Sequence, residues 1–155
     1  MFRTLRVIFC ALVLIGTMGA GTKILGSADG DTPGIHIDVT QLKRISRNMV
    51  SLQFVLVNGT GAQIGMGGFM DGENNMRDND TIAGVYLDDG TTQYNVVRDA
   101  QEKCVCSSHM GYLQPKAKIN LWAKFPAPPA SVTKLTVDIP HFPPVEDVAL
   151  TPLNQ

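Results

Sequence analysis

An alternating pattern in residues 117–139 constrains the fold of this chain more than any other feature. In AKINLWAKF, apolar residues from Ile119 onward alternate with mostly polar ones from Lys118 onward. The later residues Leu135 to Ile139 alternate in the same way. Successive side chains of a β-strand point to opposite faces, so each half predicts a strand with one buried face. The intervening FPAPPAS predicts that the two strands are a neighbouring pair in an antiparallel β-sandwich.

Two earlier segments show the same alternation. Residues 35–40 and 49–57 each predict a strand, with apolar side chains on one face. The second segment ends at Asn58-Gly59, a dipeptide that is common in turns. With Thr60, these residues also fit the glycosylation sequon.

Asp88-Asp89-Gly90 is the strongest hairpin signal in the chain. It lies between β-rich segments at 82–87 and 91–98, and Asp-Gly tolerates the backbone of a tight turn. Tyr86 and Tyr94 are expected to pair across this hairpin. With a short closing strand at 145–150, about seven strands are predicted. The predicted fold is all-β, a single immunoglobulin-like antiparallel β-sandwich over residues 35–152.

The first 21 residues show the three-part pattern of a secretory signal peptide. Two arginines precede the apolar run at 7–15, and small residues follow it. Cleavage is predicted after Gly21 or after Ala28, with residues 22–34 as a flexible lead-in. An uncleaved segment 5–21 would instead anchor the chain in a membrane. Both outcomes predict an exported protein in the periplasm, the cell envelope or the extracellular space.

Composition and motifs argue against two classes of function. The formal net charge is −1, and no cluster of Lys and Arg predicts nucleic-acid binding. No Ser-His-Asp arrangement at a family spacing and no G-x-S-x-G motif is visible. The sequence therefore predicts a protein that is not an enzyme and needs no cofactor.

Cys104-Val105-Cys106 leaves three hypotheses open. The cysteines form a structural disulfide in a tight turn or stay as two buried thiols, or they form a strained and reducible disulfide with a redox role. The third hypothesis is a soft-metal site, because His109 and Met110 follow closely. Thiolate, imidazole and thioether ligands together suit copper(I) or zinc. Candidate metal ligands are Cys104, Cys106, His109 and Met110.

A long surface loop is predicted at residues 58–81, and its second half is acidic. Its oxygen-bearing side chains suit calcium. Counted from Asp71, the sixth and twelfth positions hold Met76 and Ile82, which excludes an EF-hand. A looser calcium loop and a solvated loop that contacts a partner remain open. The candidate contact residues are Asp71, Glu73, Asp78 and Asp80.

Trp122 is the other candidate for contact with a partner. By alternation it lies on the polar face of its strand, where an indole is suited to bind a protein or a glycan. The alternative is that the proline-rich corner at 126–129 or the tail at 142–144 folds over the indole.

Three stretches are similar to a known group of domains. VLVNGT, QYNVVRDAQEKCVCSS and LQPKAKINLWAKFPAPPASVTKLTVDIPHFPPVEDVAL resemble the telokin-like, immunoglobulin-like domains of unknown function found on bacterial envelope proteins. The resemblance covers residues 35–150. It implies an immunoglobulin-like fold and an envelope location, and it supplies no catalytic residues.

These expectations combine into one functional prediction. The chain is expected to be a non-enzymatic exported envelope module that acts through contacts with an unidentified envelope protein. The alternative is a periplasmic or extracellular soft-metal or redox accessory protein that uses the Cys-Val-Cys segment.

Overall fold

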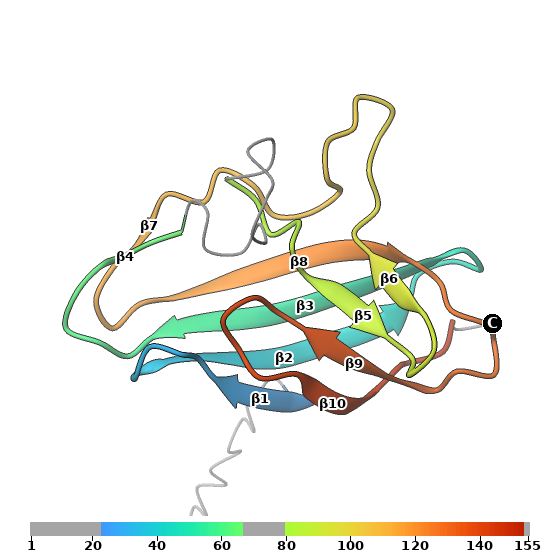
Figure 1. The fold of residues 1–155 in the computed structure, drawn as a ribbon, viewed down its shortest axis with the longest axis horizontal. Helices are drawn as coiled ribbons and strands as arrows, with labels where there is room; N and C mark the ends of the chain where they lie inside the picture. The colour runs from blue at the N-terminus through green and yellow to red at the C-terminus, as the bar shows by residue number, and fades with distance from the viewer. Residues whose placement is uncertain (1–22, 67–79, 154–155) are drawn as a thin grey trace, which may run out of the picture.

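The structure is a computed structural model, and it describes residues 23–66 and 80–153 (Figure 1). These residues contain strands and loops but no helix, which confirms the all-β prediction. They contain ten strands where about seven were predicted. The strands are β1 Gly26–Asp29, β2 Ile35–Arg44, β3 Met49–Asn58, β4 Ile64–Gly65, β5 Tyr86–Asp88, β6 Gln93–Asn95, β7 Tyr112–Leu113, β8 Lys118–Pro126, β9 Lys134–Asp138 and β10 Val145–Ala149.

The strands form antiparallel sheets. A long sheet has the order β1-β2-β3-β8, a short sheet has the order β10-β9-β5-β6, and β4 pairs with β7. The predicted alternation is confirmed in the long sheet, where Phe54 of β3 and Phe125 of β8 are fully buried. In the short sheet, Leu87 and Val137 are buried in the same way. The inward residues of both sheets form one hydrophobic cluster.

The predicted pairing across the proline-rich corner is wrong. β8 pairs with β3, whereas β9 pairs with β5 and β10, so the chain passes from the long sheet to the short sheet between them. Prolines lack the N–H that a strand ladder needs, which favours a break here. The Arg44 guanidinium fixes the corner by donating to the carbonyl oxygens of Pro128, at 2.9 Å, and Pro129, at 2.7 Å.

The predicted hairpin is confirmed, with shorter strands and a different register. Asp88 pairs with Gln93, so residues 89–92 form a four-residue loop. Gly90 supplies the positive φ of this loop, at 88°. Tyr94 lies opposite Leu87 rather than opposite Tyr86, so the expected tyrosine pair does not form.

Asn58 is a structural residue rather than an accessible glycosylation site. Its side chain is fully buried at the end of β3. The amide donates to three backbone carbonyls, those of Ala62 at 2.8 Å, Gln114 at 3.0 Å and Leu113 at 3.2 Å. The folded chain therefore withholds this nitrogen from a glycosyltransferase, and the amide joins the loops on both sides of β4 and β7.

The predicted signal segment and lead-in begin outside the described residues. The described part of residues 22–34 is more ordered than expected, because β1 pairs with β2 along four residues. No helix in residues 23–66 and 80–153 has the length and apolar character needed to cross a membrane.

Candidate functional site

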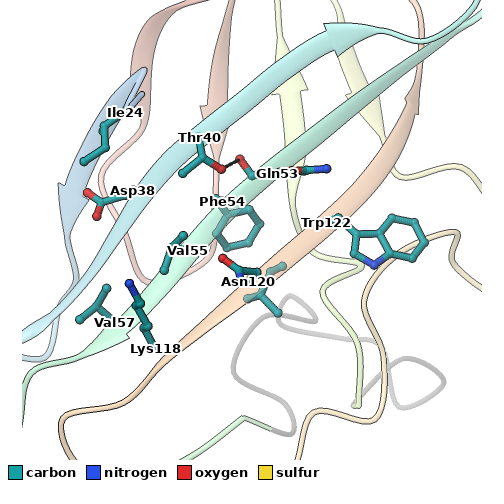
Figure 2. Close-up of a pocket in the computed structure, with 11 residues that line it drawn as sticks. Ile24, Asp38, Thr40, Gln53, Phe54, Val55, Val57, Lys118, Asn120 and Trp122 are labelled. Carbon is teal, nitrogen blue, oxygen red and sulfur yellow. Dashed lines mark hydrogen bonds between the residues drawn. The ribbon is translucent and has the colours of Figure 1, made fainter. Parts of the chain in front are cut away.

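The outer face of the long sheet carries a groove of about 820 Å³ (Figure 2). The strand register explains which side chains meet there. Trp122 lies opposite Gln53, and Asn120 lies opposite Val55. The sheet thus supplies a rigid surface on which apolar and polar groups alternate. Side chains lining the groove include Ile24, Asp38, Thr40, Gln53, Val55, Val57, Lys118, Asn120 and Trp122.

Trp122 is 40% exposed, so neither the proline-rich corner nor the tail covers its indole. Phe142 of the tail is instead buried in the core. The Lys124 ammonium lies 5.9 Å from the centroid of the indole ring, within the range of a cation–π contact. The backbone of Trp122 is held by Ser107, whose N–H donates to the Trp122 carbonyl at 2.8 Å. The indole is therefore an exposed group on a fixed backbone.

Charges are arranged asymmetrically around this groove. Asp38 lies on the β2 side, where it accepts a hydrogen bond from Ser27 at 2.6 Å. Lys118 lies on β8, on the other side of Val55 and Val57. The groove thus has an acidic border, an apolar middle and a basic border.

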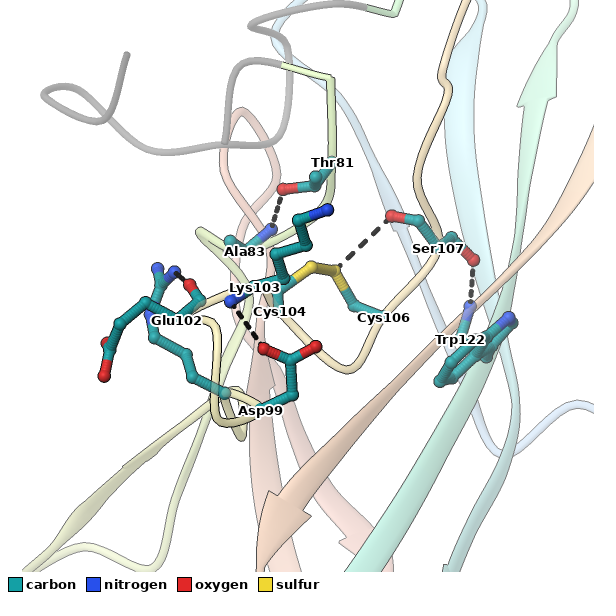
Figure 3. The surroundings of a disulfide bond; sticks show 10 residues. Thr81, Ala83, Asp99, Glu102, Lys103, Cys104, Cys106, Ser107 and Trp122 are labelled. Carbon is teal, nitrogen blue, oxygen red and sulfur yellow. Dashed lines mark hydrogen bonds between the residues drawn. A yellow bond between two sulfur atoms is a disulfide. The ribbon is translucent and has the colours of Figure 1, made fainter. Parts of the chain in front are cut away.

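The Cys-Val-Cys segment forms a disulfide beside this face (Figure 3). The Cα atoms of Cys104 and Cys106 are 5.3 Å apart, shorter than the roughly 6.6–7 Å of an extended pair. A bend at Val105 brings them together. Val105 accepts a hydrogen bond from the Lys124 N–H at 3.1 Å, and Cys106 forms a bridge with Ala123. The disulfide therefore lies in a segment, residues 104–106, that runs along the edge of β8 opposite to the edge paired with β3.

The four candidate soft-metal ligands do not converge. Cys104 and Cys106 are bonded to each other, and Met110 is buried in the core. The side chain of His109 is 94% exposed, and its Nδ1 lies 3.5 Å from Asp80 Oδ2. Within the described ranges, no three His, Cys, Asp or Glu side chains are placed to hold a metal ion.

The acidic loop is described only at its end. On the surface, Asp80 Oδ2 lies 3.5 Å from His109 Nδ1, and both side chains are at least half exposed. Asp71, Glu73 and Asp78 lie outside the described residues, so the loop's candidate contacts remain predictions.

Sequence reasoning missed a polar network in the loop of the short sheet. Asp89 accepts hydrogen bonds from the Tyr94 hydroxyl at 2.6 Å and from the Thr91 N–H and hydroxyl. These bonds lower the pKa of Asp89 to about 2. Burial, followed by the bond to Asp89, raises the pKa of Tyr94. The Asp-x-Thr spacing signals such a turn. Because the Asp89 carboxylate accepts all of these hydrogen bonds, the network stabilises the loop rather than forming a reactive centre.

Comparison with known proteins adds no relative. No family model, no curated protein and no solved structure matches this chain. The resemblance to telokin-like domains therefore remains a prediction, and the functional argument rests on the geometry of the site.

Proposed function

We propose that this chain is a non-enzymatic exported module that acts through protein–protein contacts on the outer face of the long sheet. The exposed indole of Trp122 beside the groove carries this proposal. A tryptophan provides a large contact area with few rotatable bonds, and such residues dominate the energetics of many interfaces. The rigid backbone of β8 and β3 presets its position, which lowers the entropic cost of binding.

The fold included in this proposal is an immunoglobulin-like β-sandwich. The single cluster of buried residues from both sheets supports two facing layers. The crossing of the chain from β8 to β9 also supports them. A sandwich leaves the outer face of one sheet free for a partner while the inner face stabilises the domain.

Export is the second part of the proposal. The predicted signal segment 1–21 supports it, with cleavage or with retention as an anchor. The Cys104–Cys106 bond also supports it, because disulfides persist mainly in oxidising compartments. A periplasmic, envelope or extracellular location follows from both arguments.

Site-specific photo-crosslinking in the cells that export the chain tests the contact face. A photoreactive residue replaces Asn120 beside the groove, and in a matched control it replaces Gln93. Both side chains are exposed on strands, but Gln93 lies on the short sheet. The proposal expects a discrete protein adduct at position 120 and none at position 93. Equal labelling, or labelling at position 93 alone, contradicts the assigned face.

A redox or soft-metal accessory role is the second candidate, and the bonded, partly exposed cysteine pair is the observation that favours its redox form. Intact mass of the exported protein, with and without reduction and thiol alkylation, separates the two functions. A mass increment of the size of copper or zinc that is lost in Cys104→Ser would indicate that the Cys-Val-Cys segment is the functional site. An unreactive, metal-free pair leaves the contact module as the better explanation.

A further inference from the structure

We propose that the Cys104–Cys106 disulfide is a redox switch for the contact face, and that its reduction by a dithiol loosens the strand edge that positions Trp122. The inference rests on the proposed function, because it assigns regulation to the same surface. In this role the cysteine pair changes how the face binds a partner and does not act on a separate substrate. The contacts between residues 105–107 and β8 carry the inference.

The residues beside the disulfide bind the edge of β8 at the two positions that form the cation–π contact. Ser107 binds the Trp122 backbone twice. Its N–H donates to the Trp122 carbonyl oxygen at 2.8 Å, and its hydroxyl accepts from the Trp122 N–H at 3.0 Å. The Val105 carbonyl oxygen accepts from the Lys124 N–H at 3.1 Å. Figure 3 shows Ser107 next to Cys106 and bonded to Trp122. The backbone position of the indole therefore depends on this segment.

The disulfide sets the shape of the segment. The Cα atoms of Cys104 and Cys106 are 5.3 Å apart, whereas an extended chain would place them about 6.6–7 Å apart. One end of the segment is held without the disulfide, because Cys104 forms a β-bridge with Arg98. Breaking the disulfide allows the segment to extend. With Cys104 held in place, this extension displaces Ser107 from its hydrogen bonds to β8.

Reduction is expected to leave the rest of the fold in place. A bond between residues two apart closes one of the shortest loops that a chain can form, so it removes little conformational freedom from the unfolded state. β8 also remains paired with β3 along its whole length, from Lys118 to Pro126. The switch therefore acts on one edge of β8 rather than on the stability of the domain.

Exchange with a dithiol proceeds at Cys104. This residue is partly exposed whereas Cys106 is 6% exposed, so an incoming thiolate reaches the Cys104 sulfur. The S–S bond breaks as the donor sulfur bonds to Cys104, and the Cys106 sulfur leaves as a thiolate that takes a proton. The second thiol of the donor then attacks the donor sulfur of this mixed disulfide and releases Cys104, which also takes a proton. The donor is oxidised to a disulfide, and the two cysteines are reduced to thiols.

Amide hydrogen exchange tests the inference, measured by NMR on the purified exported chain before and after reduction with dithiothreitol. We expect the Trp122 and Ser107 amides to exchange about tenfold faster after reduction, because each loses a hydrogen bond. The Leu121 amide is the matched control, since Leu121 pairs with Phe54 of β3 and should be unaffected. Equal acceleration at all three amides would mean that the whole domain opens, which overturns the switch. Unchanged exchange at Trp122 after complete reduction overturns it too, as does a disulfide that resists reduction in the folded chain.

A variant without the cysteine pair separates the effect of the bond from other effects of the reductant. Cys104→Ala/Cys106→Ala should exchange like the reduced wild-type chain and should not respond to dithiothreitol. Trp122 is the only tryptophan of the chain, so its fluorescence anisotropy provides a second measurement of the loosening. We expect a lower anisotropy in the folded variant than in the oxidised wild-type chain. Equal anisotropy, or a response of the variant to dithiothreitol, contradicts the switch.

Crosslinking from position 120 distinguishes failure of this inference from failure of the proposed function. We expect the oxidised chain to form the adduct and Cys104→Ala/Cys106→Ala to lose most of it. An adduct that persists at the same level in the folded variant supports the contact function and overturns the switch. Absence of the adduct in the oxidised wild-type chain overturns both.

Discussion

The two four-stranded sheets share one core but differ on their outer faces. The long sheet exposes an indole and valines beside a groove, with Asp38 and Lys118 on opposite sides of β3. The short sheet presents mainly polar side chains that bind one another. Tyr94 donates to Asp89, and Lys134 lies 3.2 Å from Asp147. Burial and a hydrogen bond to Asp138 raise the pKa of Tyr86 on the same sheet.

This difference indicates which face can bind a partner with the more favourable free energy. Polar groups that already bind one another offer little to a partner, since binding must first break those bonds. Covering exposed apolar groups with a partner lowers the free energy of the complex, by about 25 cal/mol per Å² of apolar surface removed from water. Covering the outer face of the long sheet would therefore stabilise a complex, whereas the polar side chains of the short sheet already bind one another.

The largest expected effect separates the inner and outer faces of β3. Phe54 is fully buried, so Phe54→Ala should lower the free energy of unfolding by about 3–5 kcal/mol. Val55, the next residue, faces the groove, and Val55→Thr should cost less than about 0.5 kcal/mol in the monomer. Urea unfolding of both variants at low protein concentration provides the measurement. Equal losses would show that the outer face is covered within the monomer.

The next effect concerns the end of β3. Asn58→Ala leaves the carbonyls of Ala62, Leu113 and Gln114 without their shared donor in a buried site. We expect the free energy of unfolding to fall by about 2–3 kcal/mol. Thr60→Ala is a milder control, because the Thr60 hydroxyl donates to the side-chain oxygen Oδ1 of Asn58 from a more exposed position. A loss for Asn58→Ala no larger than that for Thr60→Ala would contradict the structural role of the amide.

The inner faces of the sheets could be predicted from the sequence, because alternation is a local property of each strand. Phe54 and Leu121 were placed correctly by period two alone, and their burial followed. Strand partners were harder, since they depend on packing between distant residues. The separation of β8 from β9 depends in part on Arg44, more than 80 residues before the corner that it binds.

The candidate site shows the same limit. Trp122 was identified because a tryptophan at a polar strand position stands out in one segment. The placement of opposite charges on the two sides of β3 was not identified. Asp38 and Lys118 are far apart in sequence, and only their pairing with β3 relates them. The match of Asn58 to the sequon likewise did not reveal that its amide is buried.

A smaller effect tests a defect in the long sheet. The side-chain oxygen of Gln41 is buried without a hydrogen-bond partner. Gln41→Met keeps a similar shape and removes the unpaired oxygen, so it should raise the free energy of unfolding by about 1 kcal/mol. Thermal unfolding with Gln53→Met as the matched control would show the gain, because Gln53 lies opposite Gln41 and is exposed. A loss of stability in Gln41→Met would indicate that the oxygen has a partner.

The smallest effect belongs to the short sheet and depends on pH. The pKa of Asp89 falls from 3.8 to about 2 on folding, chiefly through the Tyr94 hydroxyl. A lowered pKa stabilises the fold above the unfolded value, and this contribution is lost as the pH falls from about 4 to about 2. Asp89→Asn should therefore flatten the acid decline of the unfolding midpoint across this window.

Tyr94→Phe sharpens that test, because it removes the largest cause of the shift while leaving the carboxylate in place. In this variant, an NMR titration should find the pKa of Asp89 closer to 3.8 than to 2. The Thr91 bonds remain and should keep it somewhat below the ordinary value. Crosslinking from position 120 on the long sheet should be the same in both variants. A change in crosslinking with either variant would mean that the two outer faces do not act separately, as the comparison between them requires.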